Sequence, residues 1–493
     1  MVRKIVETQL FIHVSERLIP IFTWAIILMP IYLSPFRPAI VSYFILAYFL
    51  YFLYKTLKSV YFAAIAYQLL EQAGKIDWHK RLIKTAGWGD LRHYVLITNY
   101  KESIEKITIT IQKLAEQEYD LSKVNIVLAM EMREGEQSRN RSDAIKKEFG
   151  HIFGEIITTY HEMVEGEVVG KASNEAHAGK LIYEHALEKG IPSEKVLVTI
   201  ADADSLFPPQ YLSYLALEFL KDVDRKYHFY WAPILLYNNF WKLSLPIRMQ
   251  AILHSVVRIS LLPQRDDLIQ VSTYATNLWL LHSVGFWDTD IIPEDWHIWL
   301  QAFFKHGTKV KTIPIYLPVI GDAVFTGQLR STFRNRYEQE RRWAWGATDI
   351  PYAIKRFFET PHIPAWPKLK KILFLAEAHL MWPTSFFVLT LSAWVPGIIN
   401  PSFGRTVMGY LLPQVSSVIL TLGTLTLIIM LYFDHKLRES VNVKTQFRNV
   451  PLLFIQWYLL PIVSFIFSSL PALEAHTRLL LGKKLEYKVT EKL

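Results

Sequence analysis

Long apolar runs near both ends of the chain constrain its fold more than any other feature. Residues 18–33 and 39–54 form two runs separated by a proline-rich turn, and apolar sequence returns at 372–399, 410–433 and 450–470. Each run approaches the roughly 20 residues with which a helix crosses a bilayer core. The sequence therefore predicts a multi-pass integral membrane protein whose central domain lies between two groups of transmembrane helices.

The distribution of charge predicts an orientation. Basic residues flank the first pair of runs, and only Arg37 lies between them. Because cytoplasmic loops are enriched in lysine and arginine, this bias places the central domain on the cytoplasmic side of the inner or plasma membrane. For the last run the charge rule and the available length conflict, and Pro461 and Pro471 interrupt it; we expect a cytoplasmic tail. The net charge of +9 fits membrane-adjacent basic residues better than nucleic-acid binding, since no nucleic-acid motif stands out.

Strand-like and helix-like segments alternate in the central domain. The strand-like segments are 94–98, 124–130, 154–159 and 196–201, and helix-like stretches at 104–117, 139–149 and 172–188 separate them. This alternation predicts right-handed βαβ units and a mostly parallel sheet. The chain has no Gly-x-Gly-x-x-Gly or Gly-Lys-Ser/Thr loop, which disfavours dinucleotide and P-loop sites. It also has no cysteine, which excludes a thiolate zinc site and a cysteine nucleophile.

The last of these strand-like segments runs directly into Asp202 and Asp204. Ligands of open α/β sheets bind outside the carboxyl ends of the strands, and two acids one residue apart can hold a divalent cation. The pattern alone is weak, because Asp-x-Asp recurs at 222–224 and 288–290 and such a pair is more often a cap or a solvated turn. The preceding strand favours the nucleotide-phosphate end of an active site.

Five segments, in this order, resemble those of the membrane-integrated family 2 glycosyltransferases, the group of cellulose, chitin and hyaluronan synthases and of ceramide glucosyltransferase. They are Ile97-Thr-Asn-Tyr-Lys-Glu102, Gly170-Lys-Ala-Ser-Asn174, Ala201-Asp-Ala-Asp204, Glu294-Asp295 and Gln339-Glu-Arg-Arg-Trp343. The last matches Gln-x-x-Arg-Trp in full. The resemblance implies a Rossmann-like α/β fold of the glycosyltransferase A type, in a cytoplasmic domain with a mostly parallel sheet, flanked by transmembrane helices.

The resulting domain prediction has six parts. They are an N-terminal transmembrane hairpin at 1–54, an interfacial or linker helix at 55–92, the glycosyltransferase domain at 93–346, an interfacial segment at 347–371, a C-terminal membrane region at 372–482 and a basic tail at 483–493.

The resemblance also implies roles for individual residues. Asp202 and Asp204 would carry Mg²⁺ or Mn²⁺, which neutralises the departing diphosphate of a UDP-sugar. Asp295, preceded by Glu294, would be the base that takes the proton of the acceptor hydroxyl. The further candidates for the nucleotide or its diphosphate are Tyr100, Glu102, Glu131, Lys171 and Arg342, and those for the acceptor are Gln339 and Trp343.

Each role has a simpler rival. Asp295 could be a first-turn helix acid, and Trp343 could anchor the membrane interface. Lys171 could be a solvated lysine. Arg330, Arg334 and Arg336 are expected to form a juxtamembrane basic patch.

Two departures from the family pattern and the tail qualify the resemblance. Glu131 stands near the position of the family's base-contacting aspartate, which puts uracil specificity in doubt, and Pro293 replaces the threonine before Glu294. Tyr487-Lys-Val-Thr-Glu-Lys492 is similar to the gating loop of cellulose synthases, in which Thr490 and Lys492 would reach the diphosphate. A disordered basic terminus is the equal alternative.

The expected function is inverting transfer from a UDP-sugar to a growing polysaccharide, which then passes through the membrane helices. Transfer of a single sugar to a lipid acceptor is the alternative, and a non-catalytic, nucleotide-binding membrane scaffold is a third reading. About five spans are few for a channel, so a homo-oligomer or an accessory subunit is a further expected partner, beside membrane lipids.

Overall fold

The computed structural model describes residues 8–445 and 449–485. Within them the chain forms two compact units. Residues 65–243 and 261–327 form what we call the sheet unit, and the residues up to 64, those at 244–260 and those from 328 onward form the helical unit.

A seven-stranded sheet with the order β3-β2-β1-β4-β7-β5-β8 is the centre of the sheet unit. Its strands are β1 Arg92–Thr98, β2 Val124–Glu131, β3 Glu155–His161, β4 Val196–Asp202, β5 His228–Trp231, β7 Tyr274–Asn277 and β8 Lys311–Pro314. Only β7 runs antiparallel to its neighbours, β4 and β5. The mostly parallel sheet predicted from the sequence is confirmed. A second, two-stranded sheet pairs β6 (Ile234–Leu235) with β9 (Val319–Ile320).

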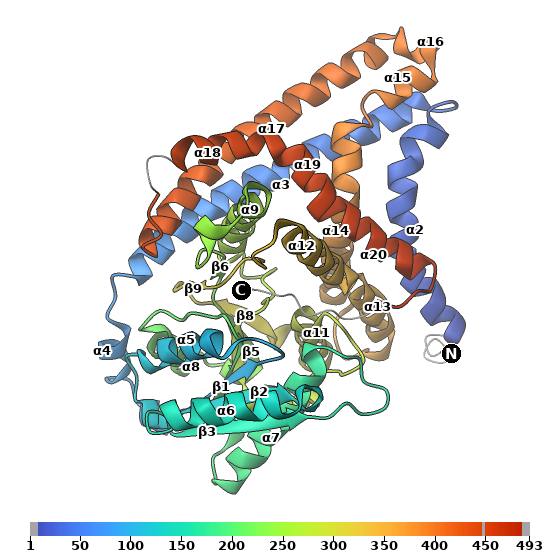
Figure 1. Cartoon of the computed structure of the whole chain (residues 1–493). Helices are drawn as coiled ribbons and strands as arrows, with labels where there is room; N and C mark the ends of the chain where they lie inside the picture. The colour runs from blue at the N-terminus through green and yellow to red at the C-terminus, as the bar shows by residue number, and fades with distance from the viewer. Residues whose placement is uncertain (1–7, 446–448, 486–493) are drawn as a thin grey trace. The chain divides into compact units, whose positions relative to one another are not determined.

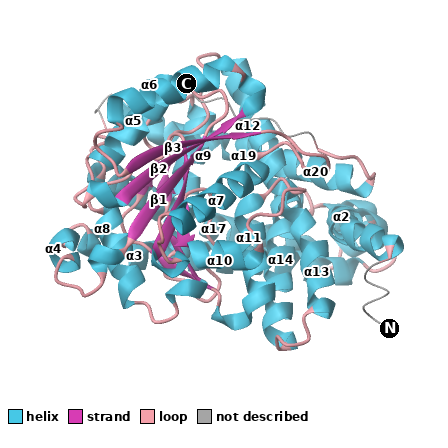
Figure 2. Cartoon of the chain, turned by 90° about the horizontal axis from the view of Figure 1, so that it is seen from below, coloured by secondary structure: helices cyan, strands magenta, loops and turns pink. Residues whose placement is uncertain are grey.

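Helices cover both faces of the larger sheet. The helices of this unit are α4 Trp78–Leu82, α5 Ile104–Ala115, α6 Glu136–Phe149, α7 Lys171–Glu188, α8 Tyr211–Lys221, α10 Leu278–Val284 and α11 Glu294–His306. The crossover through α5 leads from β1 to β2, and the crossover through α6 leads from β2 to β3, so both run toward the β3 edge of the sheet. The crossover through α7 runs in the opposite direction, from β3 to β4. Right-handed crossovers therefore place α5 and α6 on one face of β1–β3 and α7 on the other, as Figure 2 shows. Every residue of β2 is buried, which is typical of a parallel strand covered on both faces.

The strand register places three strand ends side by side. Thr98, the last residue of β1, is paired with Ala129 of β2 and with Asp202 of β4. The segments that follow β1, β2 and β4 therefore leave the same edge of the sheet, where a ligand crevice is expected.

The helical unit contains long apolar helices (Figure 1). Its helices are α2 Gln9–Leu33, α3 Pro38–Ala73, α9 Leu245–Leu261, α12 Leu329–Ala344, α13 Asp349–Glu359, α14 Ala365–Thr390, α15 Val395–Ile399, α16 Pro401–Gly404, α17 Val407–Ser440, α18 Val450–Ile455, α19 Leu460–Ser464 and α20 Leu470–Leu480, and a π-helix, η11, spans Phe465–Ser469. Among the described residues, five segments are long and apolar enough to cross a membrane: Leu10–Leu33, Pro38–Ala73, Ala365–Thr390, Val407–Ser440 and Val450–Leu480.

The second of these segments differs from the sequence prediction. Residues 55–73, the first part of the interfacial or linker helix expected at 55–92, continue the apolar run as one helix of 36 residues. At 1.5 Å per residue such a helix is about 54 Å long, so it extends well beyond a bilayer core of about 30 Å. No helix-breaking residue separates the two parts: between Pro38 and Gly74 the sequence has neither proline nor glycine.

Candidate active site

A buried lysine joins the acids at the edge of the sheet. Lys171 begins α7, and its Nζ lies 3.0 Å from Asp202 Oδ1, 3.3 Å from Glu175 Oε1 and 3.5 Å from Glu294 Oε1. Its side chain is only 12% exposed, so the expected solvated lysine is wrong. Burial disfavours the charge of this ammonium, but the carboxylates around it outweigh burial and raise the pKa of Lys171.

Asp295 is held against Asp202 by Ser272. The Ser272 backbone N–H donates to Asp295 Oδ2 at 2.7 Å, and the Ser272 hydroxyl donates to Asp202 Oδ2. Ser272 has a φ of 64°, a left-handed conformation that is uncommon for residues other than glycine and that often marks functional sites. The strained residue thus links the predicted base to the predicted metal ligand.

The second carboxylate oxygen of Asp295 has surroundings different from those of the first. Asp295 Oδ1 is buried and has no hydrogen-bond partner among the residues that the structure describes, although the residue as a whole is partly exposed. Burial and, next, the charge of Glu294 raise the pKa of Asp295, Lys171 lowers it, and the resulting pKa is about 7. A pKa near neutrality suits a general base.

Glu175 is a member of the cluster that the sequence analysis missed. It lies one turn after Lys171 on α7 and is fully buried. Burial raises the pKa of Glu175 well above its usual range, Lys171 lowers it, and the charges of Glu294 and Asp295 raise it, which favours the protonated acid. The spacing of four residues from Lys171 was the available signal, whereas Ser272 has no signal in the sequence.

Asp204 and Glu102 make contacts of a different kind. Asp204 Oδ2 accepts from the backbone N–H of Asp322 at 3.0 Å. Glu102 Oε2 accepts from the backbone N–H of Tyr100 at 2.6 Å and from the Asn99 amide at 3.0 Å. Glu102 therefore shapes the loop after β1, and burial raises its pKa to about 7.

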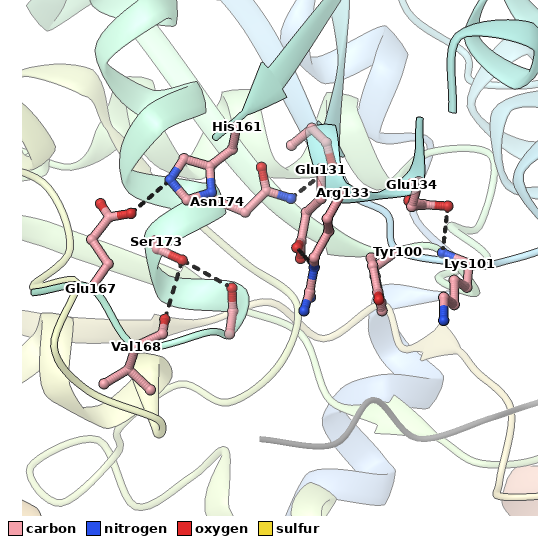
Figure 3. A network of polar contacts seen from close by, with 12 residues as sticks. Tyr100, Lys101, Glu131, Arg133, Glu134, His161, Glu167, Val168, Ser173 and Asn174 are labelled. Atoms are coloured by element: carbon pink, nitrogen blue, oxygen red, sulfur yellow. Dashed lines mark hydrogen bonds and ion pairs between the residues drawn. The ribbon is translucent and has the colours of Figure 1, made fainter. Parts of the chain in front are cut away.

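Tyr100, Glu131 and Arg133 lie together beyond the ends of β1 and β2 (Figure 3). Arg133 pairs with Glu131, and its guanidinium carbon lies 3.7 Å from the centre of the Tyr100 ring. Arg133 was not among the residues expected from the sequence. A carboxylate can accept hydrogen bonds from the edge of a nucleobase, and an aromatic ring beside it can stack on the face of that base.

Asn174 and the nearby turn support this corner. The Asn174 amide donates to the carbonyl of Ala129 at 2.9 Å, which ties α7 to the end of β2 (Figure 3). His161 Nε2 lies 2.9 Å from Glu167 Oε2 in the segment before α7. The resembling segment Gly170–Asn174 thus supplies both the buried ammonium of Lys171 and a support for β2.

The acids fit a divalent cation by charge and by ligand type. Lys171 faces Asp202, Glu175, Glu294 and Asp295, so the cluster carries surplus negative charge. Among the described residues no group of three or more histidine, aspartate or glutamate side chains is arranged as a metal site. One or two carboxylates completed by substrate phosphates are nevertheless the usual environment of Mg²⁺.

The remaining candidates lie in the helical unit or outside the described residues. Gln339 is buried, and Arg342 and Trp343 follow it on α12. Arg336, predicted as part of a juxtamembrane patch, is also buried and paired with Glu340; that prediction is wrong for Arg336. Arg330 and Arg334 are exposed. Thr490 and Lys492 lie outside the described residues.

A family model described as glycosyl transferase family group 2 matches residues 197–434. The matched stretch contains Asp202, Asp204, Asp295 and the Gln-x-x-Arg-Trp motif, and it continues into α17. Just under half of the chain therefore matches the family 2 glycosyltransferases. The mostly parallel sheet agrees with the α/β domain that the sequence predicted, and the described residues include five candidate membrane helices.

Two solved structures are similar to this chain at low identity. The mannosyltransferase PcManGT from Pyrobaculum calidifontis, in complex with GDP-Man and Mn²⁺, is 16% identical with a TM-score of 0.40, covering 78% of this chain and 100% of its own. Residues 1–349 of Staphylococcus aureus TarS are 11% identical with a TM-score of 0.36, covering 68% and 90%. No curated protein sequence matches the chain.

Proposed function

We propose that this chain is a glycosyltransferase that moves a sugar, with inversion, from a UDP-sugar to a growing polysaccharide at the cytoplasmic face of the membrane. The observation that carries the proposal is Asp295: a buried carboxylate with one unpartnered oxygen and a pKa near 7, linked through Ser272 to Asp202. A silent scaffold has no need to hold a buried acid in this state, because burying a polar group without a partner costs stability.

The reaction requires one proton transfer and one displacement. Asp295 takes the proton of the acceptor hydroxyl, and the acceptor oxygen forms a bond to the anomeric carbon. The bond from that carbon to the diphosphate breaks, and UDP leaves with its electrons. Attack from the side opposite the diphosphate inverts the anomeric centre, so an α-linked donor gives a β-linked product.

A divalent cation fits Asp202 and Asp204. When bound, Mg²⁺ or Mn²⁺ would neutralise charge that develops on the departing diphosphate. The chain's own contribution is to hold Asp202: Lys171 and Ser272 each engage one of its oxygens. In this proposal Glu131 accepts from the uracil edge and Tyr100 stacks on its face. Arg342 pairs with phosphate oxygens, as the resemblance implies.

The test is release of UDP by the purified protein in nanodiscs, with Mn²⁺, across a panel of UDP-sugars. We expect one donor to turn over, and both Asp295→Asn and chelation of the metal to abolish turnover. Asp290→Asn, a change at an exposed aspartate nearby, is the matched control. Turnover that Asp295→Asn leaves intact would contradict the role of the base.

An apolar cavity favours a second acceptor, a lipid that carries a phosphate. The cavity, of about 370 Å³, lies in the helical unit between α12 and the segment 459–467. Its lining is Pro246, Phe333, Arg334, Tyr337, Leu459, Ile462, Val463, Ile466 and Phe467. This volume falls in the range of roughly 300 to 1,000 Å³ that ligand pockets occupy.

Charge indicates which lipid would fit the cavity. The Arg334 side chain is 73% exposed, and its Nε lies 3.7 Å from a Glu338 carboxylate oxygen, so its donors remain accessible to an anion at the rim of an apolar lining. A hydrocarbon chain would pack on Phe333 and Val463 while a phosphate pairs with Arg334.

The lipid acceptor is tested by supplying a polyprenyl phosphate in the nanodiscs and extracting the labelled product with organic solvent. Ile462→Trp should narrow the cavity and lower the yield of lipid-linked sugar. Ile428→Trp, at an exposed position of α17, is the control. Product that is entirely water-soluble polymer, unaffected by Ile462→Trp, would favour the polysaccharide acceptor.

A further inference from the structure

Arg336 is the centre of a buried polar network in the helical unit. Its side chain is only 4% exposed. Its Nε donates to Gln250 Oε1 at 2.6 Å and its Nη1 to Gln339 Oε1 at 2.5 Å. Its Nη2 donates to His254 Nε2 at 3.0 Å and also pairs with Glu340. All three nitrogens of the guanidinium are therefore engaged, by residues from α9 and α12.

The same guanidinium lies beside Trp343. The Arg336 guanidinium carbon is 5.1 Å from the centre of the Trp343 ring, within the range of a cation–π interaction. The His254 ring lies 5.6 Å from the same indole, tilted by 45°. Trp343 is seven residues after Arg336, two turns along α12, so both side chains lie on the same face of the helix.

The network also reaches the last candidate membrane segment. The Gln250 amide, whose oxygen accepts from Arg336, donates through Nε2 to the carbonyl of Phe467 at 2.9 Å. Phe467 lies within the π-helix Phe465–Ser469, and such turns occur frequently at functional sites. Arg336 thus links α12 to α9 directly and to η11 through one side chain.

We propose that Arg336 is a positioning residue, which fixes Gln339 and the ring of Trp343 for binding of the acceptor. Its effect on catalysis rests on the proposed function, whereas its effect on Trp343 does not. A planar guanidinium suits this arrangement because it presents several N–H donors in fixed directions. A lysine ammonium at the same place would keep the positive charge but lack this planar set of donors.

The position of Trp343 is tested directly by hydroxyl-radical footprinting with peptide mass spectrometry of the full chain in nanodiscs. Arg336→Gln uncovers one side of the indole, and we expect oxidation of Trp343 to rise several-fold. Oxidation of Trp345, which is 8% exposed, should not change and serves as the internal reference. Arg330→Gln removes an exposed arginine from the same helix and is the matched control.

The kinetic test separates acceptor use from donor chemistry. The quantity measured is the transfer ratio, which is the amount of labelled sugar recovered in product divided by the amount of UDP released. The assay uses the donor that turns over best and nanodiscs made from a bacterial polar lipid extract. We expect a ratio near one for the wild type and for Arg330→Gln. For Arg336→Gln we expect transfer to fall by roughly 10²-fold, the scale of a misplaced binding group, while release of UDP to water persists.

Arg336→Lys guards against a variant that fails to fold, because it retains the charge that Glu340 requires. It should raise the oxidation of Trp343 and lower the transfer ratio in the same direction. Unchanged oxidation of Trp343 in both variants overturns the proposal, and so does an equal loss of UDP release and transfer in a folded variant. If the wild type releases no UDP from any donor, the proposed function fails, and the footprint still decides whether Arg336 positions Trp343.

Discussion

Replacing Asp295 by asparagine should remove activity and add stability, and the added stability should depend on pH. The pKa of Asp295 is raised from an ordinary 3.8 to about 7, chiefly by burial. An unfolded chain releases this proton near pH 4, whereas the folded chain releases it only near pH 7. The free energy of unfolding therefore falls as the pH rises through this window and is constant above it.

The magnitude follows from the size of the shift. A difference of about 3 pKa units corresponds to about 4 kcal/mol above pH 7, and at pH 5 only about 1 to 2 kcal/mol of this cost is present. An asparagine side chain cannot ionise, so Asp295→Asn avoids the cost at every pH. The stability gained by the variant should therefore grow by about 3 kcal/mol between pH 5 and pH 8, or roughly 6 to 12 °C in Tm for a unit of this size.

The assay is thermal unfolding followed by tryptophan fluorescence, in detergent with EDTA, at pH 5 and pH 8. For the control Asp290→Asn, the difference in Tm between variant and wild type should be the same at both pH values, because this aspartate is exposed. UDP release by Asp295→Asn should fall by roughly 10² to 10⁴ at pH 8. The Tm gained by Asp295→Asn over the wild type should be larger at pH 8 than at pH 5. An equal gain at both pH values, or a larger gain at pH 5, would refute the conclusion that Asp295 is a buried acid with a raised pKa.

Three further changes test the neighbouring residues. Asp202→Asn should abolish the stimulation of UDP release by Mn²⁺, measured by titration of the metal. Lys171→Met removes the ammonium that lowers the pKa of Asp295, so the acid limb of the pH–rate profile should move to a pH above 7. Glu131→Gln should weaken UDP binding by about tenfold or more, because a hydrogen bond to a charged group is worth about 1.5 to 3 kcal/mol, and should improve CDP binding relative to UDP in calorimetry.

The parallel part of the sheet could be predicted from the sequence because it depends on a local pattern, the alternation of strand-like and helix-like segments. Each strand from β1 to β4 is a short strand-like segment followed by a helical stretch, and each begins and ends within two residues of its expected bounds. The antiparallel strand β7 was not predicted. It has only four residues, Tyr274–Asn277, and its place between β4 and β5 is set by contacts distant in the sequence.

The candidate acids were predictable as residue types but their surroundings were not. Sequence motifs identify Asp202 and Asp295. They do not indicate Ser272, which lies about 70 residues after Asp202 and forms hydrogen bonds with both acids. Burial of a lysine or an arginine is equally invisible in sequence, because both residues are usually exposed. For that reason a solvated lysine stood as the simpler alternative for Lys171, and Arg336 was predicted as part of a basic patch. The domain bounds and the site roles remain predictions.

The two buried charge clusters of this chain differ in a way that separates chemistry from support. Around Arg336 every guanidinium nitrogen is engaged by a defined acceptor, and a fully satisfied network makes a region rigid. Around Lys171 the acids outnumber the cation, and Asp295 Oδ1 and Glu175 Oε2 have no hydrogen-bond partner among the described residues. Buried groups left without partners cost stability, so they persist where a substrate, a proton or a cation completes them. This contrast supports the proposal that the reaction takes place at the cluster at the sheet edge and that Arg336 holds α12.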